Sequence, residues 1–299
     1  MGSAPAKIAF AGGTLDRAPH LRDNGAAERL RAVDSSRTVL VGRDQEVAVT
    51  PRRSLALVPV APLPAGAELT FLGLDDAGAA LFAYDATAGA GGDGEIVNFV
   101  PLRGLGSELD PAEAALAAYA VALIGWHRVQ RYCGRSGDAT VVEAAGHRRR
   151  CPGCGLVIFP RTDPAITMLV QSGDRCLLSR RTGAPENRWS ALAGFVEPGE
   201  TPEEAVIREA REETAVDVVG VEYVASQPWP FPQALMIGFW AFVDPAATDA
   251  DPAPDEAELV EARWWGRSEL ADALNAGEII LPPPGTIGNY LISTWLANR

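Results

Sequence analysis

The stretch Gly194–Val216, GFVEPGETPEEAVIREAREETAV, decides how the second half of the chain folds. Near its centre, Thr201-Pro202-Glu203-Glu204 predicts the start of a helix. Threonine can cap the first turn, proline fits its first position, and a glutamate three residues past the cap can bond back to it. We therefore expect a helix over residues 201–214.

Three glutamates share one face of this predicted helix. Glu209 and Glu213 are four residues apart, and Glu212 is three beyond Glu209. Like charges at these separations repel, and Mg2+ or Mn2+ would relieve the repulsion because hard divalent ions prefer oxygen ligands. Glu197 and Glu200, in the loop before the helix, add further acidic oxygens. A solvated acidic helix face is the alternative interpretation of such a cluster.

The charged positions of this stretch resemble the signature of the Nudix hydrolase family, G-x5-E-x7-R-E-U-x-E-E-x-G-U, where U is aliphatic. The matching residues are Gly194, Glu200, Arg208, Glu209, Glu212 and Glu213. Two positions depart from the signature: Ala210 is only weakly aliphatic, and Ala215 replaces the final glycine. Glycine there permits a left-handed residue, so Ala215 either costs about 1 kcal/mol or the helix ends differently. Neither change removes a ligand.

The resemblance implies a metal-dependent hydrolase that cleaves a pyrophosphate. Bound Mg2+ or Mn2+ would lower the pKa of a water molecule and neutralise the leaving phosphate. Arg208 would orient a carboxylate through a bidentate pair. Glu212 would be a metal ligand or the general base, a position that is not constant in this family. The implied catalytic residues are Arg208, Glu212 and Glu213, and the implied metal ligands are Ala193 through its carbonyl, Glu209, Glu213 and Glu258.

The segment Ser226–Ala234, SQPWPFPQA, resembles the SQPWPFPxS motif of the NAD(H) pyrophosphatases within the Nudix family. We expect its prolines to hold Trp229 and Phe231 as exposed rings suited to stacking on nicotinamide or adenine. The alternative is a proline-aromatic turn that closes the core. The run LPPPGTIG at 281–288 resembles a substrate-contacting loop of the same subfamily. The implied substrate-binding residues are Phe195, Gln227, Trp229, Phe231, Gln233, Ala234 and Gly288.

Three of the four cysteines indicate a zinc site. Cys151-Pro152-Gly153-Cys154 is a zinc knuckle, but the partner knuckle that begins at Cys133 has Ser136 where a second cysteine would stand. The subfamily usually carries a four-cysteine ribbon, so structural zinc would need a fourth ligand. His147, Asp138 and water are the alternatives, together with weak or absent metal. Cys176, between apolar neighbours, is expected to be a buried small hydrophobe.

We predict three segments: a β-rich α+β domain at 1–128 that ends in a helix, a zinc-ribbon-like module at 129–160, and a Nudix α/β/α sandwich at 161–299. The N-terminal strands are expected at 37–50, 54–60, 68–74 and 79–84, and its helix opens at Asp110-Pro111 with His127 packed near its end. The C-terminal strands are expected at 165–170, 175–179, 233–243 and 256–265. A second helix over 268–275 would be capped by Ser268.

The composition of the chain limits the kinds of partner that we expect it to bind. With 26 basic and 39 acidic residues the net charge is −13, which disfavours binding of bare nucleic acid. Apolar runs are too short to span a membrane, and the N-terminus lacks a signal-peptide core, so we expect a cytoplasmic protein. The resemblance implies a homodimer that cuts NAD(H) into NMN(H) and AMP and also acts on NAD caps of RNA. The alternatives are hydrolysis of another nucleoside diphosphate derivative such as ADP-ribose, or a silent regulatory module.

Overall fold

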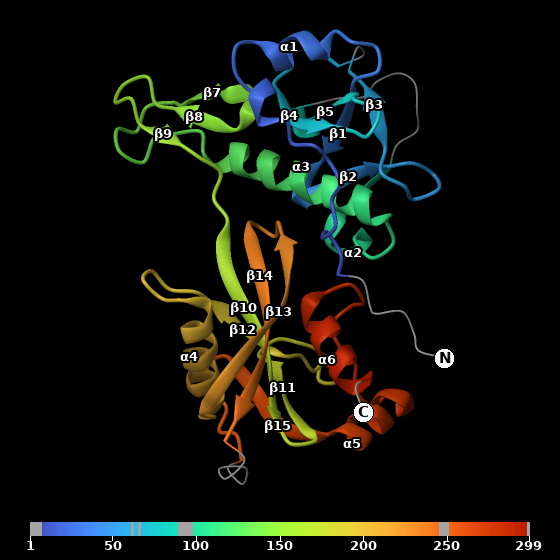
Figure 1. Cartoon of the computed structure of the whole chain (residues 1–299), viewed down its shortest axis with the longest axis vertical. Coiled ribbons are helices and arrows are strands. Elements are labelled where there is room, and N and C mark those ends of the chain that lie inside the picture. Colours follow the sequence, from blue (N-terminus) through green and yellow to red (C-terminus); the bar gives the residue numbers. More distant parts are fainter. Residues whose placement is uncertain (1–7, 61–62, 65–66, 89–97, 245–250, 298–299) are drawn as a thin grey trace. The chain divides into compact units, whose positions relative to one another are not determined.

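A computed structural model describes residues 8–60, 63–64, 67–88, 98–244 and 251–297 of the 299-residue chain (Figure 1). The chain divides into two compact units. The C-terminal unit contains Asp163–Pro228 and Ala234–Arg299, and the N-terminal unit contains Ala9–Thr162 together with Trp229–Gln233. A five-residue segment of the predicted motif therefore belongs to a different unit from the residues on either side of it.

The C-terminal unit is built on a mixed six-stranded sheet with the order β13-β14-β10-β11-β15, in which β12 also pairs with β10. The central strand β10 runs parallel to β14 and antiparallel to β11 and β12. The strands are β10 (Asp163–Ser172), β11 (Arg175–Arg181), β12 (Leu192–Phe195), β13 (Val218–Trp229), β14 (Ala234–Val243) and β15 (Leu259–Gly266).

Alternation along β10 explains why helices cover both faces of this sheet. Successive side chains of a strand point to opposite faces. Met168 packs in one core cluster with Val206 of helix α4 (Pro202–Thr214), whereas Leu169 packs in another with Leu291 of helix α6 (Ile287–Ala297). Helix α5 (Arg267–Ala276) joins the second cluster. Figure 1 shows α4 on one side of the sheet and α5 and α6 on the other, which confirms the predicted α/β/α sandwich.

The N-terminal unit contains a second six-stranded sheet, with the order β4-β5-β1-β2-β6 and β3 paired with β1. The long helix α3 (Pro111–Val129) packs on it, capped as predicted by Asp110, whose carboxylate accepts from the Ala112 N–H at 2.9 Å. This confirms a β-rich domain with a closing helix. The other elements are α1 (Ala26–Arg31), β1 (Arg37–Val41), β2 (Glu46–Val49), β3 (Leu57–Pro59), β4 (Leu69–Leu74), β5 (Ala80–Asp85), β6 (Asn98–Pro101) and α2 (Leu102–Leu105).

A three-stranded sheet carries the cysteine module: β7 (Val141–Glu143), β8 (Arg148–Arg150) and β9 (Val157–Ile158). The basic run on β8 is engaged within the protein. Arg148 and Arg150 both pair with Glu143, at 2.9 Å and 2.8 Å, and Arg149 is buried and donates to the Thr140 hydroxyl at 2.7 Å. These arginines support the small sheet rather than presenting a free basic surface.

Several elements differ from the sequence prediction. The stretch 37–50 is two antiparallel strands, β1 and β2, because the chain turns through Asp44 in the left-handed region (φ 49°). Helix α5 begins at Arg267 with Gly266 at its N-cap, so Ser268 lies inside the helix and does not cap it. Helices α1, α2 and α6 and strands β6, β12 and β13 have no counterpart in the sequence prediction. The Gly/Ala-rich stretch 86–94 and the Pro-, Asp- and Ala-rich stretch 244–255 are expected to be loops, and parts of both fall outside the described residues.

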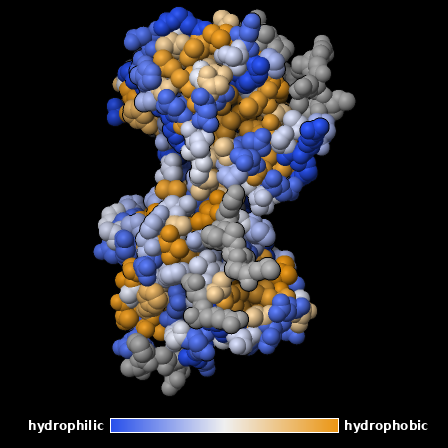
Figure 2. Space-filling view, turned by 45° about the vertical axis from the view of Figure 1, so that its right-hand side comes forward, coloured by the Kyte–Doolittle hydropathy of each residue, from blue (hydrophilic) through white to orange (hydrophobic). Residues whose placement is uncertain are grey.

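The surface alone does not single out a site. In Figure 2 hydrophobic residues lie among hydrophilic ones on the visible surface of each unit. Scattered exposed apolar side chains are normal on protein surfaces. Within the described ranges, none of the helices combines the length and hydropathy that crossing a membrane requires.

Helix α4 ends at the residue that departs from the Nudix signature. Ala215 adopts the left-handed conformation (φ 56°) and its N–H donates to the Arg211 carbonyl at 2.9 Å, so the alanine keeps the backbone geometry that glycine would allow. We expect Ala215→Gly to raise the free energy of unfolding by about 1 kcal/mol, because the Cβ strain is removed. Urea unfolding measures this. Glu203→Gly, in the first turn of the same helix, is the control and should lower stability; a loss in both variants would contradict the assignment of strain to Ala215.

Candidate functional site

Helix α4 begins as predicted and carries the glutamates of the site. Thr201 and Glu204 form the reciprocal capping box: the Glu204 N–H donates to the threonine hydroxyl at 3.2 Å, and the Thr201 N–H donates to the glutamate carboxylate at 2.8 Å. The cap fixes where the helix starts, and thereby which side chains face β12. Glu209 and Glu213, one turn apart, follow from that register.

Arg208 gathers three carboxylates at the start of the site. Its Nε and one terminal nitrogen contact both oxygens of Glu200 at 2.7 Å and 2.9 Å, and its other terminal nitrogen contacts Glu209 and Glu212, each at 2.9 Å. It also donates to the Phe195 carbonyl at 2.9 Å. Hydrogen bonding from Arg208 lowers the pKa of Glu200, and the carboxylates raise the pKa of Arg208. Arg208 thus holds an acidic cluster in place.

Gly194, the first residue of the signature, lies against the Glu209 carboxylate. A Cβ atom built on Gly194 would come within 2.0 Å of the Glu209 carboxyl carbon, so any side chain at 194 would displace this carboxylate. Since Gly194 belongs to β12 and Glu209 to α4, this close approach sets the distance between the predicted ligand and the strand edge. The glycine is needed for space and not for a special backbone conformation.

Glu213 is a buried carboxylate whose hydrogen bonding is incomplete. Its side chain is 3% exposed, and within the described part of the chain its Oε2 atom has no hydrogen-bond partner. Burial raises the pKa of Glu213 to about 7; Arg181 opposes this shift, while the negative charges of Glu209, Glu258 and Asp255 add to it. A divalent metal ion would compensate the charge of this buried carboxylate and would take its unpartnered oxygen as a ligand.

Arg181 shows where such a cation fits. A single terminal nitrogen of its guanidinium donates to the Ala193 carbonyl and lies 3.4 Å from Glu213 Oε1. Two of the predicted metal ligands therefore share one positive charge in this structure. A divalent ion bound by the same two oxygens would take the place of the guanidinium, so the donor set fits the implied metal.

The other two predicted metal ligands, Glu209 and Glu258, lie near Glu213 but are less closely grouped with it than the Ala193 carbonyl is. Glu209 and Glu258 are near enough to Glu213 to raise its pKa, and the Glu258 side chain is exposed. Among the described residues, these glutamates do not form a group whose ligand atoms all lie within 4.8 Å of one another. Glu209 instead remains bound to Arg208. Sequence reasoning missed Arg181 and Asp255, because nothing in the sequence distinguishes Arg181 from Arg180 beside it.

The expectation that Trp229 and Phe231 present exposed rings is wrong for Phe231, which is 8% exposed and part of the main hydrophobic core of the N-terminal unit. Trp229 is half-buried against the same core. Both rings pack edge-on against Phe10, with centroid separations of 6.1 Å and 5.8 Å, and Arg103 lies over both. The apolar neighbours explain the burial, as in the alternative of a turn that closes a core. Stacking on substrate stays a prediction.

Gln227 ties two predicted substrate segments together. Its side chain is 1% exposed, donates to the Gly285 carbonyl at 2.8 Å and accepts from the Ile287 N–H at 2.9 Å. The run 281–288 is thereby fastened to β13, and Gly288 lies in the first turn of α6. Among the other residues predicted to contact substrate, Phe195 is 62% exposed. Phe195 and Ala234 belong to the C-terminal unit, whereas Gln233 belongs to the N-terminal unit.

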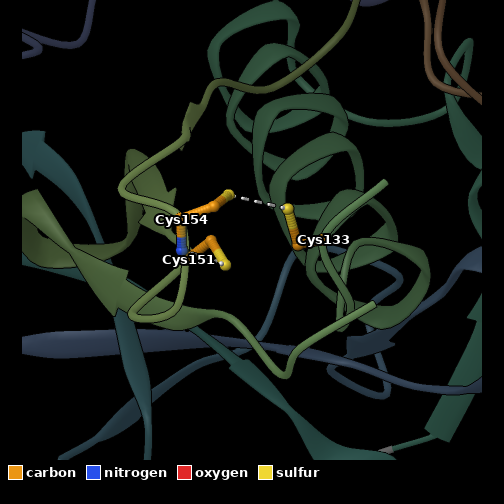
Figure 3. A group of neighbouring side chains, drawn as sticks. All are labelled: Cys133, Cys151 and Cys154. Carbon is orange, nitrogen blue, oxygen red and sulfur yellow. Dashed lines mark hydrogen bonds between the residues drawn. The ribbon is translucent and has the colours of Figure 1, made fainter. Parts of the chain in front are cut away.

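The three predicted zinc ligands meet in the cysteine module. The sulfur atoms of Cys133, Cys151 and Cys154 all lie within 4.8 Å of one another, and Cys133 and Cys154 are 3.6 Å apart (Figure 3). Backbone N–H groups of Ser136 and Arg135 lower the pKa of Cys133 to about 6, which favours the thiolate that zinc needs. Cys176 is fully buried, its pKa raised to about 12 by that burial, as expected of a core thiol.

The two histidines near the cysteine module, His127 and His147, form hydrogen bonds to groups outside the cysteine cluster. His147, one of the alternatives for the fourth ligand, bonds through Nε2 to the Phe71 carbonyl at 2.7 Å and stacks obliquely on Tyr119. These contacts hold it in the neighbouring core, so this alternative is excluded in the observed conformation. His127 contacts the Gly146 carbonyl at 2.9 Å and Arg149 at 2.9 Å, which confirms a packed histidine.

The raised pKa of Glu213 predicts how the metal-free protein responds to pH. Between its ordinary value of 4.5 and about 7, the folded protein keeps a proton that the unfolded chain releases. This contribution to stability is complete below about pH 4.5 and is lost as the pH rises through 7, a change of about 3 kcal/mol. With chelator present, we expect Glu213→Gln to have the higher Tm at pH 8 and no advantage at pH 4.5. An equal difference at both pH values would contradict the ionisation of Glu213 as the cause.

Known protein families match the chain along most of its length. Residues 161–281 match the NUDIX domain, 17–126 the NADH pyrophosphatase-like rudimentary NUDIX domain, and 128–159 the NADH pyrophosphatase zinc ribbon domain. The NAD-capped RNA hydrolase NudC of Mycobacterium bovis is 38% identical over 94% of this chain and 92% of its own length. The mitochondrial NAD(P)H pyrophosphatase NUDT13 of Mus musculus is 36% identical over 68% of this chain and 60% of its own length. With its rudimentary N-terminal domain and zinc ribbon, the chain belongs to the NADH pyrophosphatase subfamily of the Nudix hydrolases.

Proposed function

We propose that this protein hydrolyses the pyrophosphate of NAD(H) to give NMN(H) and AMP, and that it also removes NAD caps from RNA. The observation that carries hydrolysis is the buried Glu213 carboxylate, which shares one cation with the Ala193 carbonyl. The names of the relatives support the substrate, since one is an NAD-capped RNA hydrolase and another an NAD(P)H pyrophosphatase.

Ala193, Glu209, Glu213 and Glu258 would hold Mg2+ or Mn2+. When bound, these ions lower the pKa of the attacking water and neutralise charge on the phosphates. Arg208 keeps Glu209 and Glu212 in position through its two 2.9 Å contacts. The Glu212 side chain is 60% exposed and can accept a proton from water, which makes it the proposed general base. Phe195, also exposed, offers a ring on which a base of the substrate can stack.

The proposal also covers the three segments of the chain, its assembly, the further substrate-binding residues and the zinc ion. We propose that segments 1–128, 129–160 and 161–299 act together as a cytoplasmic homodimer, and that Trp229, Gln233, Ala234 and Gly288 contribute to substrate binding. Zinc in the cysteine module would be structural, because its three thiolates leave no open position for chemistry once a fourth ligand is present.

Product analysis tests the proposal. The protein is incubated with Mn2+ and, in parallel, NADH, NAD+, ADP-ribose or NAD-capped RNA, and the products are separated by chromatography. We expect NMNH and AMP from NADH, with a larger kcat/KM than for ADP-ribose. Faster ADP-ribose hydrolysis would favour a different nucleoside diphosphate substrate, and no hydrolysis of any of the four would favour the silent regulatory module. Comparing NADH with NAD-capped RNA establishes which of the two is preferred.

A further inference from the structure

The cysteine module has three of the four ligands that a structural zinc site requires. Structural zinc is almost always four-coordinate and tetrahedral. Cys133, Cys151 and Cys154 place three sulfur atoms within 4.8 Å of one another, but the position that would complete the first knuckle is Ser136. A stable site therefore depends on which atom fills the fourth corner.

Two oxygen atoms lie close to Cys151 Sγ. Ser136 Oγ is 3.2 Å from Cys151 Sγ, and Asp138 Oδ2 is 3.9 Å from the same sulfur. With bonds of about 2.3 Å to sulfur and 2.0–2.2 Å to oxygen, the sulfur–oxygen edge of a zinc tetrahedron is about 3.5 Å. For Cys151 the two distances lie on either side of this value. The Ser136 hydroxyl also hydrogen-bonds to Cys133 and Cys154. The Asp138 carboxylate is not among the groups that lie within 4.8 Å of all three sulfurs, so it would have to turn toward Cys133 and Cys154 to complete the site.

The hydrogen bond between the two oxygens distinguishes their roles. Ser136 Oγ donates to Asp138 Oδ2 at 2.8 Å, because an ionised carboxylate can only accept. The serine is then a neutral hydroxyl whose proton points at the aspartate, which makes it a poor zinc ligand. A carboxylate is an ordinary zinc ligand and is anionic at neutral pH. The serine is suited to orienting the carboxylate.

The second knuckle leaves room for this carboxylate. A Cβ atom built on Gly153 would lie 2.0 Å from Asp138 Oδ2. The φ angle of Gly153 is not in the left-handed region, so its backbone does not require glycine. The missing side chain instead lets the Asp138 carboxylate reach over the knuckle. The Asp138 backbone is also fixed to the first knuckle, because its carbonyl accepts from the Cys133 N–H at 2.8 Å.

We propose that Asp138 supplies the fourth ligand, giving a Cys3Asp zinc site, and that Ser136 is its positioning residue. The proposal rests on structural zinc being bound, as proposed above, and is independent of the NAD(H) substrate. His147, the alternative protein ligand considered for this position, is engaged with the Phe71 carbonyl. The carboxylate lies to the Cys151 side of the triad and turns toward the other two sulfurs when the ion binds.

Zinc affinity of the purified full-length protein, measured by competition with a chromophoric chelator, tests the assignment. We expect Asp138→Asn to weaken zinc binding by about 10-fold or more and Ser136→Ala by a few-fold only. Gly153→Ala leaves every candidate ligand present but displaces the carboxylate, and should weaken binding as Asp138→Asn does. Losses confined to Ser136→Ala would overturn the proposal in favour of a serine ligand.

A double-mutant cycle provides the second measurement, and it remains informative if Asp138→Asn alone folds poorly. Ser136→Cys supplies a fourth thiolate, so zinc should bind more tightly and Asp138→Asn should have little further effect in that background. Co2+ absorption reports the ligands directly, since the thiolate charge-transfer bands should intensify in Ser136→Cys. Equal effects of Asp138→Asn in both backgrounds would overturn the aspartate ligand alone. Wild-type protein without zinc would overturn structural zinc as well, while NADH hydrolysis would stand as a separate result.

Discussion

Replacing either Glu209 or Glu213 with glutamine is expected to lower kcat for NADH by about 10²-fold or more with the fold intact. Each substitution keeps the shape of the side chain and removes an anion from the proposed metal site. Glu213 should be the more sensitive of the two, because its carboxylate is buried and lacks a partner for Oε2, whereas Glu209 is held by Arg208. Steady-state kinetics at saturating Mg2+ measures the effect.

The matched control is Glu203→Gln, an exposed glutamate in the first turn of the same helix, for which we expect kcat within twofold of wild type. Circular dichroism and Tm establish that each variant is folded. Activity within a few-fold of wild type for both Glu209→Gln and Glu213→Gln would refute the proposed metal cluster. The expected combination for Glu213→Gln is an almost inactive protein whose metal-free form is more stable at pH 8 than wild type.

Phe231→Ala is expected to lower the free energy of unfolding by about 3–5 kcal/mol, the usual loss when a buried aromatic side chain is truncated. The ring is 8% exposed and packs against Phe10 and Trp229. Urea unfolding measures the loss. Phe231→Leu retains an apolar side chain of similar reach and should recover most of the stability. A loss below about 1 kcal/mol in Phe231→Ala would mean that the ring is not part of the core.

Variants of the neighbouring Trp229 separate a packing role from a substrate role. If the half-buried Trp229 also stacks on the substrate, Trp229→Ala should raise KM for NADH more than it lowers kcat, because stacking holds the ring in ground and transition states alike. Trp229→Phe should then recover both KM and stability in part. A normal KM in a destabilised Trp229→Ala protein would limit this residue to packing.

The sequence predicts the parts of the site whose geometry is local. The capping box at Thr201 and Glu204 determines where α4 starts, and helical periodicity then places Glu209 and Glu213 on one face. The meeting of the three cysteines is also local in origin, because two short knuckles carry them. The α/β/α sandwich follows from the family resemblance, and alternation along β10 supplies its physical basis.

Other features depend on contacts between residues far apart in the chain and could not be predicted. Arg181 reaches the site only because β11 ends beside Ala193, 12 residues further along. Phe231 is buried because Phe10, more than two hundred residues earlier, packs against it. His147 is taken out of the zinc site by Phe71, 76 residues away. Helix α6 has no charged residue to mark its polar face, although Ile287, Leu291 and Trp295 are buried at helical spacing.

The assignment of Trp229–Gln233 to the N-terminal unit means that this unit is not one continuous piece of chain. A fragment ending at Thr162 would carry Phe10 and Arg103 without the Trp229 and Phe231 rings that they pack against. A fragment starting at Asp163 would carry these two rings without Phe10 and Arg103. Cutting the gene at this boundary would expose apolar surface in both products. Fusion, tagging or truncation of this protein should therefore keep the whole chain together, and a protease that nicks the 162–163 connection should leave a noncovalent complex in place of two free domains.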